Sequence, residues 1–211
     1  ALTAIGIALA TFAAYAPSLT FGFLLWDDLS YVTENPLIRD LSPAGILRMF
    51  STQHQSNYHP LSLLSYALEY KFFGLNPLAY HLTNVLLHVG NTVLLLLFLL
   101  LLTGRIFPAA LASLLWGVHP FHVESVTWIA ERRDVLFTFF FLLCLITYRL
   151  ERDGARRAWQ GPVSLALFTL ACFAKAMAVS LPAVLLLLEY RQTPHPPLRA
   201  VLRRVLPFLL V

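Results

Sequence analysis

Long apolar stretches separated by short polar segments dominate the chain. Seven of these stretches are expected to form membrane-spanning helices, at residues 1–25, 78–102, 106–118, 134–148, 162–174, 177–190 and 201–211. A helix of roughly 20 apolar residues crosses a hydrocarbon core about 30 Å thick, because each residue adds about 1.5 Å. The pattern therefore predicts an all-α fold, a polytopic transmembrane helix bundle that forms a single transmembrane domain over residues 1–211.

The two ends of the chain bear on this interpretation. The first apolar stretch lacks the basic start and the small-residue cleavage site of a signal peptide, so we expect it to be a retained span. The chain starts at Ala1 rather than Met and stops inside the apolar run from Leu206 to Val211. We therefore interpret the sequence as a fragment of a longer protein.

The segment 26–76 differs from the rest in being polar, aromatic and rich in turn residues. It carries too many charges to lie in lipid. We expect it to form a large first external loop that contains short helices.

The segment from Pro162 to Tyr190 has two interpretations, one tilted helix or two short helices meeting at Lys175. Two short helices divide the basic residues nine against six between the two sides of the membrane, whereas a single helix divides them five against ten. The positive-inside rule favours two helices, with the first span starting in the cytoplasm. Asp27, Asp28, the large loop and the segment 119–134 then face outside.

The amino-acid composition is typical of a membrane protein and indicates which kinds of partner to expect. Hydrophobic residues make up 58% of the chain and charged residues 12%, about half the charged share of a soluble domain. The net charge of +4 comes from arginines on short loops beside the spans, so we expect a lipid bilayer and no nucleic acid as partner. Cys144 and Cys172 lie within apolar runs and are expected to be small core residues rather than a disulfide framework.

Four polar residues recur along the second apolar stretch at steps of three, four and three: His81, Asn84, His88 and Asn91. At about 100° per residue these steps place all four on one narrow stripe of a helix. The inner half of the stretch, 93–102, is wholly apolar. One interpretation is a polar groove that descends from the outer face to the middle of the membrane. The alternative is that these side chains only bond neighbouring helices.

The pair Asp27 and Asp28 follows the first span directly. A carboxylate fixed at the membrane surface can act as a general base or bind a metal, and two adjacent carboxylates raise each other's pKa. An Asp at this place can also simply terminate a helix.

The segment 119–134 concentrates further candidates. His119, His122 and Glu124 have spacings compatible with a metal site, although local spacing supplies no third strong ligand. The guanidinium groups of Arg132 and Arg133 match phosphate oxygens. The alternative for these arginines is salt bridging with the carboxylates of the same segment.

Lys175 lies among apolar residues, so it must reach the membrane surface, pair with an acid or meet an anion. Two half-length helices that meet at a lysine would form a recessed anion site.

Together these motifs resemble a known family, the transmembrane and tetratricopeptide-repeat O-mannosyltransferases and their bacterial relatives. The most specific part is the run from Gly117 to Leu136, GVHPFHVESVTWIAERRDVL. Similar motifs are WDD at Trp26–Asp28, YHPL at Tyr58–Leu61, GLNPLAYHLTN at Gly74–Asn84 and KAMAVSLP at Lys175–Pro182. The resemblance covers roughly residues 23–190.

The resemblance implies a GT-C fold and transfer of a sugar, expected to be mannose, from a polyprenyl or dolichyl phosphate carrier to an acceptor hydroxyl of a protein or glycan. It assigns the role of base to Asp27 or Asp28, with a slight preference for Asp27, and phosphate binding to Arg132, Arg133 and Lys175. The residues expected to line the cavity are His59, His81, His88, His119, His122 and Glu124.

The same resemblance places the site at the periplasmic face of a bacterial inner membrane, or at the lumenal face of the endoplasmic reticulum in a eukaryote. It makes no cofactor certain, and a divalent metal stays open. The chain departs from the family in having Ala176 where relatives often have Pro, and in carrying no tetratricopeptide repeat. Other classes left open are a transporter that uses the polar stripe, a haem or metal redox protein, and a noncatalytic scaffold.

Overall fold

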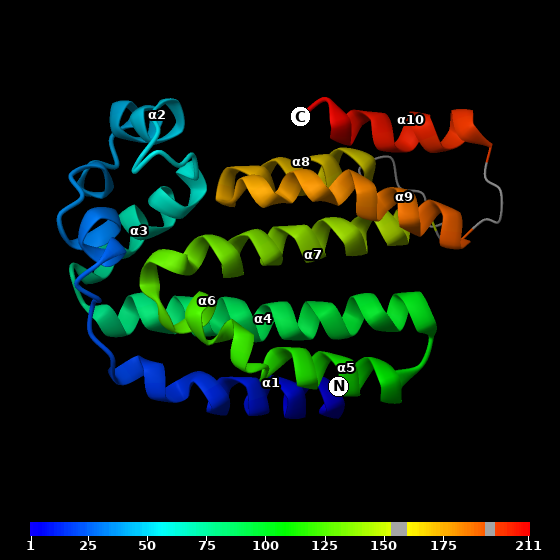
Figure 1. The fold of residues 1–211 in the computed structure, drawn as a ribbon, viewed down its shortest axis with the longest axis horizontal. Helices are drawn as coiled ribbons and strands as arrows, with labels where there is room; N and C mark the ends of the chain where they lie inside the picture. Colours follow the sequence, from blue (N-terminus) through cyan, green and yellow to red (C-terminus); the bar gives the residue numbers. More distant parts are fainter. Residues whose placement is uncertain (153–159, 193–196) are drawn as a thin grey trace.

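The computed structural model describes residues 1–152, 160–192 and 197–211, and in these residues the regular structure is helical. The longer helices are α1 (Leu2–Tyr15), α4 (Pro77–Thr103), α5 (Ile106–Gly117), α7 (Arg132–Arg152), α8 (Gln160–Ala174), α9 (Leu181–Gln192) and α10 (Leu198–Leu209). They lie roughly parallel or antiparallel to one another, while α2 (Pro43–Ser51) and α3 (Pro60–Phe73) gather at one end (Figure 1).

Short helical turns connect these elements, namely η1 (Ala16–Thr20), η2 (Leu29–Thr33), η3 (Leu37–Arg39), η4 (Pro120–His122), α6 (Val123–Thr127), η5 (Ile129–Glu131) and η6 (Ala176–Ser180). The segment 26–76 thus contains the expected short helices. Its buried side chains, among them Tyr31, Met49 and Tyr66, pack with Tyr80 of α4 and with Ile129. This packing holds the segment against the start of α4 and against the turn that precedes α7.

Helix α4 shows how local sequence sets the ends of a long helix. The side chain of Asn76 accepts a hydrogen bond from the Leu78 amide at 3.2 Å, and Pro77 occupies the first turn, where its missing amide hydrogen costs nothing. Gly104 ends the helix in the left-handed region, at a φ of 66°. The 27 residues of α4 span about 40 Å, which is longer than a hydrocarbon core.

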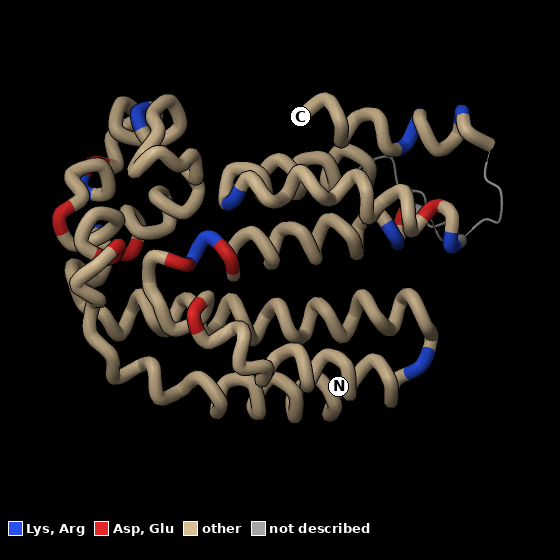
Figure 2. Tube along the Cα trace, in the orientation of Figure 1, with Lys and Arg blue, Asp and Glu red and all other residues tan. Residues whose placement is uncertain are grey.

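Two stretches of the described residues are long and apolar enough to cross a membrane, Leu2–Thr20 and Pro77–Thr103. A third would require Ile106–Gly117 and Pro120–Thr127 to count as one span bent by 47°. Charged residues lie at or next to the ends of α4, α5, α7, α8 and α9 and leave the middle parts of these helices apolar, whereas α10 carries arginines within the helix (Figure 2). This distribution is that of a membrane protein. The remaining predicted spans stay predictions.

Helix α8 ends at Ala174 and α9 begins at Leu181. The segment from Pro162 to Tyr190 therefore forms two helices, one of the two interpretations that the sequence allowed. Lys175, in the gap, has extended backbone angles (φ −158°, ψ 133°), and Pro182 follows in the first turn of α9. Helix α9 runs back along the direction from which α8 came (Figure 1).

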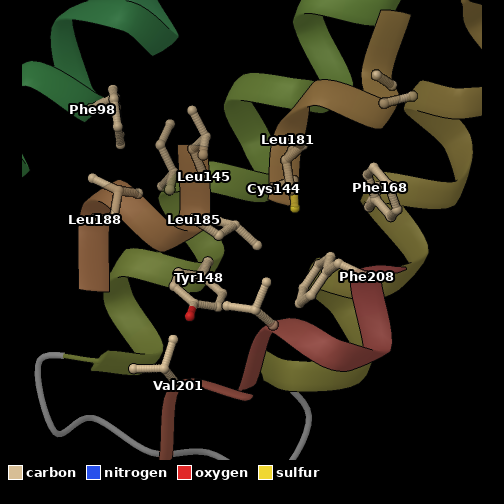
Figure 3. Packing of buried hydrophobic residues seen from close by; sticks show 14 residues of the cluster. Phe98, Cys144, Leu145, Tyr148, Phe168, Leu181, Leu185, Leu188, Val201 and Phe208 are labelled. Atoms are coloured by element: carbon tan, nitrogen blue, oxygen red, sulfur yellow. The ribbon is translucent and has the colours of Figure 1, made fainter. Parts of the chain in front are cut away.

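The largest buried cluster joins α4, α7, α8, α9 and α10. It includes Phe98, Cys144, Phe168, Leu185 and Phe208, which are labelled in Figure 3. The expectation that Cys144 is a core residue is confirmed, since it is fully buried; Cys172 is partly buried, and both are free thiols.

Candidate functional site

The acidic pair lies at the end of the bundle that also carries α3. The Asp28 side chain is 1% exposed, and its two oxygens accept hydrogen bonds from the amides of Leu24 and Ala130, each at 2.8 Å. Burial raises the pKa of this carboxyl, against the opposing effect of the two amides. Asp28 therefore fastens the start of the loop to the turn that leads into α7.

Asp27 is placed differently from its neighbour. Its side chain is half-buried, and none of the described residues makes a hydrogen bond to its carboxylate. The adjacent Trp26 lies in ring contact with Trp128, at 5.6 Å between centroids. Of the two acids, Asp27 is the one whose oxygens are available to take a proton from another molecule.

Arg132 lies inside a buried network rather than at a surface. Its side chain is 0% exposed and is ion-paired with Glu69 of α3. The guanidinium also donates to the side-chain oxygen of Asn84 and to the backbone oxygen of Tyr80, both at 2.7 Å. The Tyr66 ring lies 4.8 Å from the guanidinium carbon. With its donors taken up in this way, Arg132 has no accessible surface for a phosphate, so the structure gives it a role in joining α3, α4 and α7.

Arg133 does not take part in the buried network of Arg132, and its side chain remains partly accessible. Its guanidinium pairs with Glu131, lies 5.8 Å from the centre of the Tyr31 ring, and its side chain is 19% exposed. Arg133 therefore keeps a partly accessible guanidinium that pairs with Glu131, and it lies three residues along the chain from Ala130, whose amide bonds Asp28.

Lys175 reaches the same end of the bundle from the gap between α8 and α9. Its ammonium pairs with Asp134 in the first turn of α7, and both side chains are 27% exposed. The Ser125 hydroxyl donates to the other oxygen of Asp134 at 3.0 Å. Because Asp28 is bonded to Ala130, and Asp134 to Lys175, one short stretch of chain (130–134) links the acid of the first loop to both candidate cations.

His59 lies beside these groups, at the start of α3. Its side chain is 5% exposed, its ring centre is 5.1 Å from that of Tyr31, and its Nε2 has no hydrogen-bond partner among the described residues. Burial, together with the nearby positive charge of Arg133, lowers the pKa of His59 to about 4.

This lowered pKa makes stability depend on pH. Between the unfolded value of 6.5 and about 4 the unfolded chain binds a proton that folded His59 does not, so the free energy of unfolding falls as pH falls. The loss is at most about 3 kcal/mol. We expect His59→Gln to flatten the decline in melting temperature from pH 6.5 to 4, with His119→Asn as the control for losing a histidine. An unchanged slope in His59→Gln would contradict the assignment.

The polar stripe of α4 is buried by protein. Each of its side chains contacts a backbone oxygen of another segment: His81 Nε2 with Gly22 at 3.4 Å, Asn84 with Trp128 at 3.1 Å, His88 Nε2 with Gly117 at 2.8 Å and Asn91 with Val135 at 2.8 Å. All four residues are at most 2% exposed. The stripe therefore serves helix packing, as the alternative interpretation predicted, and is not an open groove.

The remaining candidate histidines, His119 and His122, belong to a separate aromatic group. The His122 ring lies 5.2 Å from that of His88 and 4.4 Å from that of Trp116. His119 is exposed, and its Nδ1 accepts a hydrogen bond from the Phe121 amide. Glu124 is exposed as well. No group of three or more His, Cys, Asp or Glu side chains in the described part of the chain is placed to hold a metal ion.

Sequence reasoning missed two partners, Glu69 for Arg132 and Asp134 for Lys175. Glu69 is the only acid in the α3 sequence PLSLLSYALEYKFF, and a lone carboxylate among apolar residues was a signal that it needs a cation. Asp134 lies close in sequence to Arg132 and Arg133, and spacing cannot reveal that its partner is a lysine 41 residues away.

The fold and this arrangement define a helical membrane protein with acidic and basic groups drawn together at one end of its bundle. Sequence comparison identifies its relatives. The chain is 31% identical over 171 residues to the human protein O-mannosyl-transferase TMTC3, an alignment that covers 75% of the chain and 18% of that relative. It is 41% identical over 118 residues to human TMTC2, covering 54% of the chain and 14% of the relative.

The Drosophila melanogaster protein O-mannosyl-transferase Tmtc1 is 31% identical over 178 residues, which is 79% of the chain and 20% of that protein. The chain belongs to the family of the TMTC protein O-mannosyl-transferases. It spans about a fifth or less of the length of these relatives. No protein-family model and no solved structure matches it.

Proposed function

We propose that the protein of which this chain is a part is a GT-C glycosyltransferase that moves mannose from a polyprenyl or dolichyl phosphate carrier to a serine or threonine hydroxyl of a protein. The observation that carries the proposal is that two distant parts of the chain contact residues 130–134, the stretch that also carries Arg133. These parts are the loop with Asp27 and Asp28 and the gap with Lys175. The names of the relatives support mannose as the sugar and a protein as the acceptor.

The two cations supply what a phosphate leaving group requires. Arg133 and Lys175 are partly exposed and are balanced by Glu131 and Asp134. A lipid-linked donor keeps its tail in the bilayer and presents its phosphate at the membrane surface, where both cations can exchange a carboxylate for phosphate oxygens. Positive groups held in place stabilise the negative charge that develops on the phosphate as the bond to the sugar breaks.

Asp27 is assigned to the acceptor. Its carboxylate takes the proton of the attacking hydroxyl while the hydroxyl oxygen forms a bond to the anomeric carbon of the sugar. The bond between that carbon and the phosphate oxygen breaks, and its electron pair leaves with the carrier phosphate. Asp28, which is bonded to two amides, holds Asp27 at this place.

The proposed orientation puts this end of the bundle outside the cytoplasm, facing the periplasm of a bacterium or the lumen of the endoplasmic reticulum. The excess of arginines near the opposite ends of the helices, on the predicted cytoplasmic side, supports this orientation. We propose a multi-pass topology because the described residues include two helices long and apolar enough to cross a membrane and further apolar stretches follow them.

Paired substitutions at Lys175 and Asp134 test the phosphate site. Lys175→Gln removes a cation, so we expect donor binding to weaken about tenfold. Asp134→Asn keeps the shape and the contact to Ser125 but removes the charge that competes with the phosphate, so we expect donor binding to tighten severalfold. The measurement is the Kd of a polyprenyl phosphate sugar for full-length protein in detergent or nanodiscs.

The opposite signs separate a phosphate site from a purely structural ion pair. If the pair only supported the fold, both substitutions would break the same contact and would change donor binding in the same direction. Arg48→Gln is the matched control, since Arg48 is an exposed cation of α2 that also pairs with an acid, Asp40.

A further inference from the structure

A cavity of about 720 Å³ lies between the end of α7, the start of α8 and helix α10. Its apolar lining includes Pro162, Leu165, Pro207 and Phe208, and Tyr148 adds an aromatic ring. Phe208 and Tyr148 lie edge to face, with ring centres 5.9 Å apart (Figure 3). The cavity is thus large and apolar enough to hold part of a lipid molecule.

The cavity lies at the other end of the bundle from the acidic pair. Arg191, near the end of α9, donates a hydrogen bond to the backbone oxygen of Leu102 at 3.3 Å, and Leu102 is next to the last residue of α4. The candidate site, by contrast, adjoins the first turns of α4 around Tyr80. Because α4 is long enough to cross a membrane, its end marks the level at which the hydrocarbon core meets the headgroups.

Three arginines of α10 and one glutamate supply the charges of the cavity lining: Arg199, Arg203, Arg204 and Glu151. Arg204 is held by the buried Glu189, at 2.9 Å. Arg199 and Arg203 are exposed, and neither has an ion-pair partner in the part of the chain that the structure describes. The Glu151 carboxylate lies on the α8 side, next to Gly161. Two unpaired cations against one acid leave this lining positive.

Helix α10 has the character of a helix at a membrane surface. Val201, Val205 and Phe208 face the core and are at most 6% exposed. A second row consists of exposed leucines: Leu198, Leu202, Leu206 and Leu209. The two unpaired arginines are four residues apart, so they share a face next to this leucine row. Exposed leucines beside arginines are typical of helices that lie among lipid headgroups.

We infer that this cavity binds an anionic phospholipid, whose phosphodiester contacts Arg199 and Arg203 and whose acyl chain lies against Leu165 and Phe208. The guanidinium forks match phosphate oxygens, and the apolar wall matches a hydrocarbon chain. This lipid is a separate ligand from the sugar carrier, because its site lies at the opposite end of the helices. The inference does not depend on the proposed catalytic activity.

Native mass spectrometry of the full-length protein in detergent, titrated with phosphatidylglycerol or phosphatidylcholine, tests this inference. We expect phosphatidylglycerol to bind about tenfold more tightly than phosphatidylcholine, and Arg199→Gln/Arg203→Gln to lose that preference. Arg48→Gln/Lys71→Gln removes the same number of charges from the other end of the molecule and should keep it. Leu165→Trp, which fills the cavity without changing charge, should weaken phosphatidylglycerol binding as well.

Four results would overturn the inference. Equal affinity of the wild type for both lipids would remove the role of the headgroup charge. An unchanged preference in the Arg199→Gln/Arg203→Gln variant, or unchanged binding in Leu165→Trp, would place the lipid elsewhere. Displacement of phosphatidylglycerol by an equal concentration of inorganic phosphate would identify a soluble phosphate site instead of a lipid site.

Discussion

Asp27→Asn is expected to lower the rate of sugar transfer by a factor of about 10² to 10⁴ while leaving donor affinity near that of the wild type. The amide has nearly the shape of the carboxylate but cannot accept the proton of the attacking hydroxyl. Since no described residue makes a hydrogen bond to the Asp27 carboxylate, the substitution breaks no internal contact. A loss of rate can then be attributed to the loss of the base. The measurement is the kcat for transfer to a serine- or threonine-containing peptide, with full-length protein in membranes.

Asp28→Asn is the control for this experiment, because it changes the neighbouring residue in the same way. The Asn side chain keeps one oxygen, which can accept a hydrogen bond from the backbone amide of either Leu24 or Ala130. Its NH2 group then faces the other backbone amide, which loses its acceptor. We therefore expect lower stability and a smaller loss of kcat than at Asp27. Full transfer by Asp27→Asn together with none by Asp28→Asn would reverse the assignment of the base.

Arg132→Ala is expected to have the largest effect on stability, lowering the free energy of unfolding by about 3–5 kcal/mol. The substitution leaves Glu69 buried with no cation, and it also removes the donors to Asn84 and Tyr80. We expect a fall of roughly 10 °C in apparent melting temperature.

A double substitution tests whether the loss comes from the stranded carboxylate. Arg132→Met/Glu69→Leu replaces the pair with apolar side chains and should recover much of the stability, because a buried ion pair costs desolvation that apolar packing avoids. The alternative is that Arg132 holds the donor phosphate. In that case Arg132→Ala would fold as stably as the wild type and fail to bind the donor.

The sequence was informative where a property depends on neighbours along the chain. Apolar length predicted α4 within a residue or two at either end, and the capping residues Asn76 and Gly104 explain why. The spacing of His81, Asn84, His88 and Asn91 predicted that they share one face of this helix. It could not predict what covers that face, because the carbonyls that they contact come from other segments.

The sequence could not predict the role of a residue when that role depends on a partner far away along the chain. Arg132 and Arg133 are adjacent and chemically identical, yet one is buried with Glu69, 63 residues away, and the other stays at the surface with Glu131. Helix α10 is a further example. It starts at Leu198, three residues before the predicted stretch 201–211, and carries three arginines, two of them exposed, while the span over 201–211 stays a prediction.

The claim on which the functional account depends is that a lipid phosphate, rather than a nucleotide, delivers the sugar. Full-length protein reconstituted in liposomes, with a serine- and threonine-containing peptide, allows the two donors to be compared directly. Radiolabelled mannose should pass to the peptide from a polyprenyl phosphate carrier and not from a nucleotide-linked mannose in the absence of lipid carrier. Transfer from the nucleotide sugar at the same rate, or no transfer from the lipid-linked sugar, would contradict the account.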